Sequence, residues 1–418
     1  MVFPEPTVDE QALRWLETQS GVMLDRLVDW ASVNSGSANL AGLATMLGKV
    51  EQSAATLGGT MERADLPGYE TIDDAGEPTL STFGQALHIT KHPQAERRVF
   101  LCIHMDTVFA VDHPFQSVRH DGNMLFGPGV ADAKGGLVVM LAAVEALERS
   151  TLAGRVGWDI LINPDEEVGS HGSDGLITGL ASRCDLALLY EPALPDGTLV
   201  GARKGSGNFA IVVRGRAAHA GRDFSAGRNA VAAAAQLVTR LDAVNDAEAG
   251  DGLTLNIGRI AGGGPVNIVP DTAVVRYNVR YETAAQRGRV EQAVEQAVAD
   301  INAHEGFSAR PVGAFTAPPK PVGPGSEALQ GLVEGSAAKL GLPAVNWRST
   351  GGVCDGNRTA ALGVPTIDTM GVRGGAIHSD QEFMQVDSLV ERAKLSAHLL
   401  MTLASGAVDW PVRDTPTG

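Results

Sequence analysis

The spacing of apolar residues predicts two kinds of segment in the first half of the chain. Residues 8–34 and 39–57 carry apolar positions at helical spacing, which predicts amphipathic helices. Residues 82–90 and 97–103 are predicted to be strands. From there to Glu191, short β-rich runs alternate with helical patterns. This alternation is typical of an α/β fold, in which helices flank a mostly parallel sheet.

The pattern changes near Gly201, where strands and helices follow in the order β-α-β-β-α-β. This order is typical of a ferredoxin-like α+β unit. The proline-rich stretch APPKP at residues 317–321 marks the return to the first pattern. We therefore predict a larger domain formed by residues 1–202 and 314–418, with residues 203–313 inserted into it. The predicted strands and helices of the inserted domain are residues 209–214, 229–241, 253–260, 273–281, 286–301 and 309–315. Those of the larger domain after the insertion are residues 326–340, 364–370 and 386–403.

Composition narrows the class of protein. With 418 residues, 44% apolar and 20% charged, the chain is expected to be globular and soluble, with two or three domains. A formal net charge of −16 argues against nucleic-acid and membrane partners, which require a basic surface. The three cysteines lie far apart, no secretory leader is evident, and no apolar run is long enough to cross a bilayer. We predict a cytoplasmic protein.

Metal-binding residue types recur where predicted strands end. In open α/β sheets, ligands bind at the carboxyl ends of the strands. Histidine, aspartate and glutamate without cysteine form a ligand set suited to Zn²⁺, or to Co²⁺ or Mn²⁺. The residues are His104 after the run 99–103, Asp132 before the helical pattern 137–149, Glu166 and Glu167 after 158–162, Glu191 after 186–190, and His378 after 364–370.

Residue types and spacing suggest roles within this set. An aspartate shared between two ions can hold them about 3.5–4 Å apart, and Asp132 is our choice for this bridge. Of the neighbours Glu166 and Glu167, one can bind metal while the other acts as a general base. Asp106, two residues after His104, is placed to accept the second imidazole N–H.

Each of these pieces alone has an ordinary structural explanation. His104 and Asp106 could be a satisfied pair at a strand end, Asp132 could stabilise a helix start, and an acidic loop is commonly solvated. Their joint occurrence at successive strand ends favours a metal site.

Several motifs resemble the two-zinc exopeptidase and deacylase family, which includes glutamate carboxypeptidase, acetylornithine deacetylase, succinyl-diaminopimelate desuccinylase and aminoacylase. The resemblance extends from about residue 10 to residue 403, and around His104 and Asp132 it is strongest to the glutamate carboxypeptidase branch. The motifs are HMDTV at 104–108, GPG…GG at 127–136, DEEVGS at 165–170, YEP at 190–192, AHAG at 218–221, NIVP at 267–270 and GGxxDG at 351–356.

The resemblance implies a zinc exopeptidase-like fold with two Zn²⁺ ions per subunit and assigns the ligands. One ion would be held by His104, Asp132 and Glu191, and the other by Asp132, Glu167 and His378. Glu166 would be the general base, and Asp106 would orient His104. The inserted domain would act as a lid and form a homodimer, in which His219 reaches the partner's active site and stabilises the oxyanion.

Substrate-binding residues are also implied by the resemblance. Arg280 would bind the substrate carboxylate, since a planar guanidinium matches that group, and Asn267 would contact the substrate. Gly351 and Gly352 could donate backbone N–H groups, and Arg203 and Lys204 could assist. For each cation, a surface position on a strand edge is the alternative.

Two positions depart from the family pattern. Ala133 stands between Asp132 and Lys134, where we expect little consequence, because only the aspartate side chain binds metal. Cys354 stands where members of the family usually carry serine or threonine, and we expect this departure to bear on substrate preference more than on catalysis. A nucleophilic role for Cys354 is not expected, because no activating base with its own orienting group is evident.

The predicted activity is metal-dependent hydrolysis of an amide bond next to a free carboxylate. The first choice is a carboxypeptidase that releases a C-terminal amino acid such as glutamate from a small peptide. The alternative is a deacylase of N-acyl amino acids, of the acetylornithine deacetylase type. A metal-free binding protein on the same fold is disfavoured because binding requires no general base, and a phosphate-binding loop is disfavoured because residues 127–136 lack its Gly-Lys-Ser/Thr ending.

Overall fold

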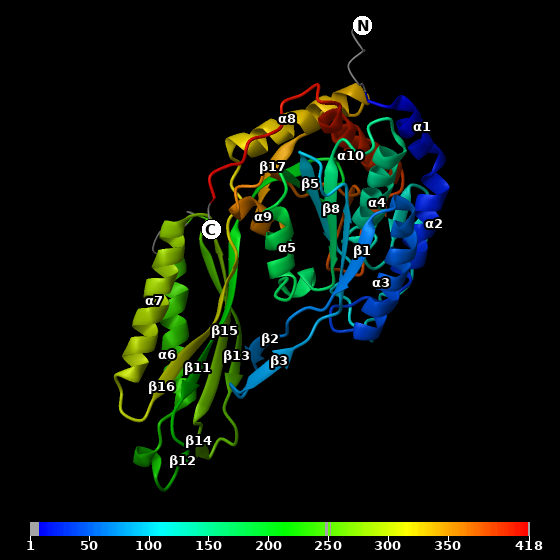
Figure 1. Cartoon of the computed structure of the whole chain (residues 1–418). Helices are drawn as coiled ribbons and strands as arrows, with labels where there is room; N and C mark the ends of the chain where they lie inside the picture. Colours follow the sequence, from blue (N-terminus) through cyan, green and yellow to red (C-terminus); the bar gives the residue numbers. More distant parts are fainter. Residues whose placement is uncertain (1–7, 247–249, 251, 417–418) are drawn as a thin grey trace.

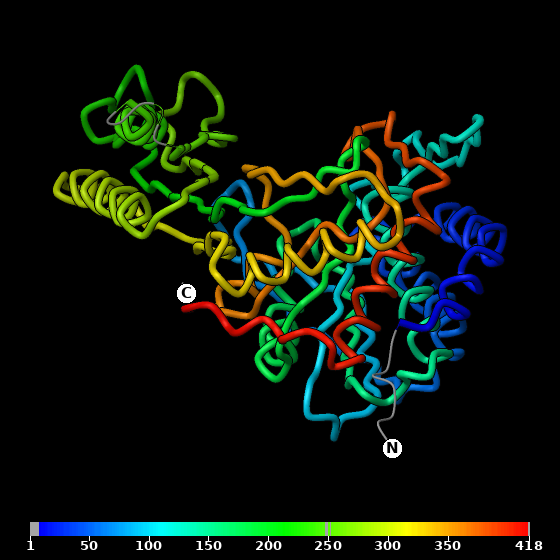
Figure 2. Tube along the Cα trace, turned by 90° about the horizontal axis from the view of Figure 1, so that it is seen from above, coloured from blue at the N-terminus to red at the C-terminus, as the bar shows by residue number. Residues whose placement is uncertain are grey.

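The computed structural model describes residues 8–246, 250 and 252–416, arranged in two parts with separate sheets (Figure 1). One part has helices on both faces of a six-stranded sheet, and the other has two helices on one face of a four-stranded sheet. Seen from above, the second part projects from one side of the first (Figure 2). The start of the chain, on which the prediction of no secretory leader depends, lies outside the described residues up to residue 7. Among the described residues, no helix has the length and apolar character that crossing a membrane requires.

The larger sheet is mixed, with parallel pairing between most of its strands. Its order is β1-β4-β8-β5-β9-β18, and the last four strands run parallel to one another. The pairs β1–β4 and β4–β8 are antiparallel. Strand β8 therefore separates β4 from β5, which are consecutive in the sequence. The bounds are β1 Thr60–Ala64, β4 Ala86–Lys91, β5 Arg98–His104, β8 Gly157–Asn163, β9 Leu186–Leu189 and β18 Thr366–Ile367.

Alternate residues of the central strands face different helical layers. In β5, Leu101 and Ile103 belong to the large core under α4, whereas Phe100 and Cys102 belong to the smaller core with α5. Helix α4 is buried along nearly its whole length between the sheet and neighbouring helices, which explains its almost uniformly apolar sequence. On the α4 side lie α1 Glu10–Thr18, α2 Ser20–Ala31, α3 Leu40–Ala54, α4 Lys134–Arg149, α8 Pro324–Lys339 and α10 Ser388–Ser405; α5 Asp174–Ala181 contacts α9 Gly356–Ala361.

The four-stranded sheet is antiparallel and has the order β13-β15-β11-β16. Together with α6 and α7, it gives the β-α-β-β-α-β sequence of elements that the apolar pattern predicts. The strand β16 continues to Ala317, so the boundary predicted after residue 313 falls inside it. The elements are β11 Gly205–Arg214, α6 Ala230–Asp242, β13 Thr254–Gly262, β15 Thr272–Tyr281, α7 Ala284–Asn302 and β16 Ser308–Ala317.

A hairpin from the larger part covers the face of this sheet that α6 and α7 leave open. Its strands are β2 Tyr69–Ile72 and β3 Pro78–Ser81, and Figure 1 shows it reaching across to the second part. Ile72 packs in a small apolar cluster with alternate strand residues, among them Val212. Its carbonyl oxygen accepts a hydrogen bond from Arg276 Nη2 at 2.8 Å.

Ion pairs surround this apolar contact. Glu77 Oε1 lies 2.5 Å from Arg214 Nη2, and Asp74 pairs with Arg259 and, at 3.4 Å, with Arg276. Because these pairs are largely exposed, each contributes no more than about 1 kcal/mol. The apolar cluster and the backbone hydrogen bond therefore define the contact.

Where the chain enters and leaves the second part, the two connecting segments lie against each other. Arg203 and Lys320 form an antiparallel bridge, and both cations bind Asp368. Asp368 is fully buried, and its two cationic partners overcome the effect of burial and hold the pKa of its carboxyl group at about 2. Through these two ion pairs, the ionised carboxylate of Asp368 connects the crossing point with the segment after β18.

Short strands complete the structure. The parallel pair β10 and β17 lies next to the crossing point, and the pair β12 and β14 lies at the far tip of the second part in Figure 1. The bounds are β10 Leu199–Arg203, β17 Trp347–Thr350, β12 Ala218–His219 and β14 Ile268–Val269, with β19 Gly374–Gly375, β20 Phe383–Gln385, β7 Met124–Phe126 and β6 Arg119–Asp121 in a further four-stranded sheet.

Candidate metal centre

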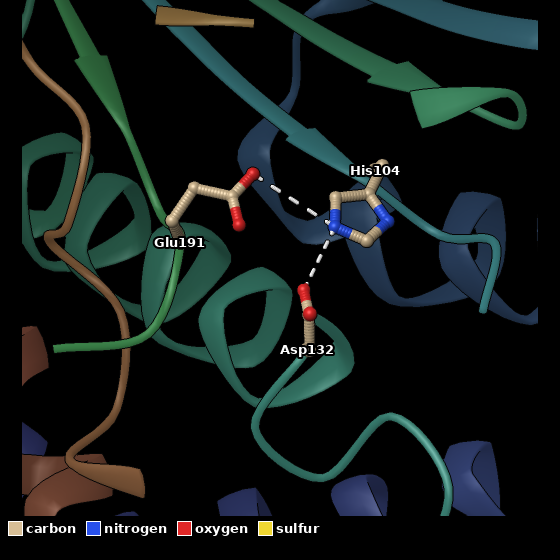
Figure 3. A group of neighbouring side chains, drawn as sticks. All are labelled: His104, Asp132 and Glu191. Carbon is tan, nitrogen blue, oxygen red and sulfur yellow. Dashed lines mark hydrogen bonds and ion pairs between the residues drawn. The ribbon is translucent and has the colours of Figure 1, made fainter. Parts of the chain in front are cut away.

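Three predicted ligands converge at the carboxyl ends of the central strands. His104 is the last residue of β5, Glu191 follows β9, and Asp132 lies in the loop before α4. Figure 3 shows their side chains pointing toward one another from these separate segments. His104 Nε2 lies 3.1 Å from Asp132 Oδ1 and 3.8 Å from Glu191 Oε1. Ligand atoms of all three lie within 4.8 Å of one another.

Asp132 also belongs to a second group. Its other oxygen, Oδ2, lies 3.3 Å from His378 Nε2, and this nitrogen lies 3.2 Å from Glu167 Oε2. Ligand atoms of Asp132, Glu167 and His378 again lie within 4.8 Å of one another. The two oxygens of Asp132 therefore face two different groups of ligands.

The charges in these groups are strongly perturbed by burial. Burial, together with the charge of Asp132, raises the pKa of Glu191 to about 8, although His104 opposes this shift. Burial is also the main cause of the raised pKa of Glu167, and Asp132 adds to it. The carboxylates in this space destabilise one another when ionised, and a bound cation would relieve that repulsion.

One atom gives a further test of whether the residues fit a metal. Glu167 Oε1 is buried and has no hydrogen-bond partner among the described residues. A buried carboxylate oxygen without a donor is costly. Together with the oxygen and nitrogen donors around it, this atom makes the site suitable for a divalent cation of the Zn²⁺ type.

Asp106 connects the first group to the acidic loop. Its backbone oxygen lies 3.1 Å and its Oδ1 3.3 Å from His104 Nδ1. Its carboxylate also accepts the backbone N–H groups of Glu166 and Glu167, each at 3.2 Å, and the Ser37 hydroxyl at 2.6 Å. Asp106 therefore contacts both the imidazole of His104 and the backbone of η2 (Glu166–Val168).

Glu166 begins η2 and is half-buried beside the two groups. Burial raises the pKa of its carboxyl group well above the usual range; Glu191 and Asp355 act in the same direction, and His104 opposes them. A carboxyl group whose pKa is raised in this way is better suited to taking up a proton than an ordinary glutamate.

Glu382 is a supporting residue that the sequence analysis missed. It is fully buried, and its carboxylate accepts backbone N–H groups of Gly129 at 3.1 Å, Ala131 at 2.9 Å and Asp132 at 3.0 Å. Three donors from one loop make Glu382 the residue that fixes the backbone of Asp132. The only signal in the sequence is an acid four residues after His378.

The Glu382→Gln variant is expected to be less stable by about 2–4 kcal/mol, because an amide NH₂ group would face backbone donors in a buried space. Chemical denaturation measures the change. The matched control is Glu62→Gln, at an exposed position of β1, which is expected to change stability by no more than about 0.5 kcal/mol. Equal stability of the two variants would contradict the role assigned to Glu382.

Arg203 has contacts that differ from the expected substrate contact. Its Nε and Nη2 donate to the two oxygens of Asp368 at 2.7 and 3.1 Å, and its Nη1 lies 3.3 Å from Gly352 O. The guanidinium therefore already binds one carboxylate with two parallel bonds. Lys204 donates to Gly252 O and lies 3.4 Å from Glu282.

The other predicted substrate residues are spread along the second part and its base. Arg280 lies in β15 opposite Ser206, close to the crossing point, and its buried Nη1 has no hydrogen-bond partner among the described residues. Asn267 and His219 lie at the opposite tip, where β12 pairs with β14. Gly351 and Gly352 are exposed directly after β17.

Comparison with known proteins agrees with this geometry. The family model described as peptidase family M20/M25/M40 matches residues 100–402, which is more than half of the chain. The chain belongs to peptidase family M20/M25/M40. Membership makes this M20 protein a metal-dependent hydrolase of C–N bonds and confirms the family resemblance and the reaction class inferred from the motifs.

Individual relatives of this M20 protein cover most of its length. It is 28% identical over 398 residues to carboxypeptidase G2 from Pseudomonas sp. (strain RS-16), which covers 92% of this chain and 89% of the relative. It is 29% identical over 306 residues to succinyl-diaminopimelate desuccinylase 1 from Alteromonas mediterranea, covering 70% and 76%. The crystal structure of Bacillus subtilis YxeP, described as a dinuclear metal binding peptidase, has the same fold, with a TM-score of 0.64, 16% identity, and coverage of 93% of this chain and 99% of that one.

Proposed function

We propose that His104, Asp132 and Glu191 hold one divalent cation and that Asp132, Glu167 and His378 hold a second. Zn²⁺ fits the ligand chemistry, and Co²⁺ or Mn²⁺ are alternatives. The unpartnered Oε1 of Glu167 and the two-sided contacts of Asp132 support two ions per chain. When bound, two such ions would polarise a water molecule and a substrate carbonyl group.

Glu166 is the proposed general base. Its carboxylate takes a proton from the attacking water and returns it to the nitrogen of the leaving amine. Asp106 acts as a positioning residue, because it holds both the imidazole of His104 and the backbone from which Glu166 projects. Cys354 takes no part as a nucleophile, since burial raises the pKa of its thiol well above the usual range.

The substrate carboxylate is assigned to Arg280, and the backbone N–H groups of Gly351 and Gly352 are proposed as further donors. The buried, unpaired Nη1 of Arg280 supports this assignment, because a substrate carboxylate would supply the missing acceptor. Arg203 instead binds Asp368 and the carbonyl oxygen of Gly352, so its proposed role is to hold these segments in place rather than to contact the substrate.

Asn267 and His219 are proposed to act on a second copy of the chain. In one chain they lie at the tip of the second part, whereas Arg280 lies at its base. They cannot contact one small substrate together with Arg280 of the same chain. A homodimer formed through residues 203–313, the proposed lid, would bring His219 of one subunit to the oxyanion in the other.

The activity supported best is that of a carboxypeptidase that releases a C-terminal amino acid such as glutamate. The observation that carries it is the shared Asp132 between two ligand groups with Glu166 beside them, and the match to carboxypeptidase G2 over 398 residues favours this branch. The match to a succinyl-diaminopimelate desuccinylase favours deacylation of N-acyl amino acids as the second candidate.

Two substrate sets separate these candidates. The metal-loaded protein is expected to release glutamate from N-blocked dipeptides that end in glutamate faster than it releases ornithine from N-acetylornithine. Peptides of the same sequence ending in lysine serve as the matched set. Failure to release glutamate from any peptide, with rapid hydrolysis of N-acetylornithine, would reject the carboxypeptidase in favour of the deacylase.

A further inference from the structure

Large apolar side chains are exposed in a group beside Glu167. Leu40, Val108, Val111 and Val168 have 45%, 41%, 69% and 45% of their surface exposed. With Glu167 they line a pocket of about 680 Å³. Apolar side chains that gather around an opening usually mark a binding surface. Because a proposed metal ligand lines the same pocket, this surface is continuous with the centre at which the amide bond would be cleaved.

A second pocket of about 450 Å³ continues the first. Leu40 and Val168 line both pockets. Farther along, the second pocket is lined by Phe83, Tyr69 and His171, and the last two rings are stacked with their centroids 3.7 Å apart and their planes at 5°. Burial, and then the charge of Arg358, lower the pKa of His171, so its ring is neutral at pH 7. This end of the groove is therefore lined by aromatic rings without charge.

The charges around the two pockets indicate whether they bind the carboxylate-bearing part of the substrate or its acyl part. No lysine or arginine is among the described residues that line either pocket. Among the described lining residues, Glu167 is the one with a charged side chain, and Ser37 in the wall donates a hydrogen bond to the carboxylate of Asp106. A substrate carboxylate placed here would find no lysine or arginine side chain of the described lining to bind it. The cationic partner proposed for that carboxylate, Arg280, lines neither pocket.

We infer that these two pockets, here called the acyl groove, bind the part of the substrate on the acyl side of the cleaved bond and select an apolar, preferably aromatic group over a dicarboxylic one such as succinyl. The inference rests on the proposed function, because it takes the cleaved amide to lie beside Glu167. It goes beyond that function in specifying the acyl group, and it separates this chain from a desuccinylase.

A series of N-acyl-glutamates tests the preference with the amino acid held constant. The metal-loaded protein is expected to hydrolyse N-hexanoyl- and N-benzoyl-glutamate with kcat/KM about tenfold or more above N-acetyl-glutamate, since each buried methylene group contributes a factor of about four. N-succinyl-glutamate is expected to fall below N-acetyl-glutamate. Equal rates across the series, or succinyl as the best substrate, would overturn the acyl groove and leave the proposed function intact.

Binding to the metal-loaded Glu166→Gln variant decides the inference independently of turnover. Isothermal titration calorimetry is expected to give the order benzoyl, acetyl, succinyl from tightest to weakest. If wild-type protein hydrolyses neither these compounds nor peptides that end in glutamate, the proposed function fails, and this binding order still supports or overturns the groove. Equal affinities would overturn it.

A charge introduced into the groove gives the converse test. Val111→Lys places a cation in the pocket wall at an exposed position, and it is expected to raise the ratio of kcat/KM for succinyl to benzoyl compounds by about tenfold. The matched control is Val22→Lys, at a position on α2 that is 51% exposed, which should leave the ratio unchanged. A changed subunit assembly of Val111→Lys with an unchanged ratio would assign the apolar surface to a contact between copies and overturn the inference.

Discussion

The Glu166→Gln variant is expected to fold normally and retain its metal content, while kcat falls by about 10²- to 10⁴-fold. Glutamine has the shape of glutamate but can neither accept the proton of the attacking water nor return it to the leaving amine. The backbone of residue 166 is held by Asp106 through its N–H group, and this bond does not depend on the side chain. The change should therefore appear in kcat, with little effect on KM.

Three measurements separate loss of chemistry from loss of structure. Circular dichroism checks the fold, elemental analysis checks the metal content, and steady-state kinetics give kcat. The matched control is Glu96→Gln, an exposed position in the loop between β4 and β5, which should be as active as the wild type. Wild-type turnover by Glu166→Gln would remove Glu166 from the reaction.

The Asp132→Ala variant is expected to lose both bound cations. Asp132 Oδ1 faces His104 and Oδ2 faces His378, so one side chain serves both ligand groups. Glu191→Ala and Glu167→Ala each remove a ligand from one group only, so each is expected to retain about one ion per chain. Because loss of both ions removes the polarised water, Asp132→Ala is also expected to be inactive.

Elemental analysis after dialysis gives the number of ions per chain directly. Asp25→Ala, at an exposed position on α2, is the matched control and should retain the wild-type number. If Asp132→Ala folded and still held one ion tightly, Asp132 would not bridge the two groups.

The convergence of the ligands was predictable because most of them follow an apolar run, and Asp132 precedes a helical one, that could be recognised locally. His104 ends β5 and Glu191 follows β9, and parallel strands place their carboxyl ends at the same edge of a sheet. The resemblance to a known family then implied which acids belong together. The same local signals predicted α4 and the succession of strands and helices in the second part.

The order and direction of the strands were harder to predict from the sequence. In β4, β5 and β8 most residues are apolar and buried, so their sequences do not specify which strand lies beside which. As a result the position of β8 between β4 and β5, and the antiparallel direction of β4 against β8, could not be foreseen.

Residues that support the site but lie far from it in the sequence also could not be predicted. Glu382 meets Asp132 across 250 positions of sequence, and Asp368 meets Arg203 across 165. No periodicity or motif links such partners, because only the folded chain brings them together. Arg203 is an example. Its position in the sequence suggested a substrate contact, whereas in the structure its guanidinium binds Asp368.

The hairpin β2–β3 gives the second part an additional support. The connecting segments at Arg203 and Lys320 attach the four-stranded sheet at one place, and Ile72 attaches its open face at another. A body secured at two points turns only about the line through them. Any swing of the tip that carries His219 toward a neighbouring subunit must therefore be a rotation about this single axis, or must first detach the hairpin.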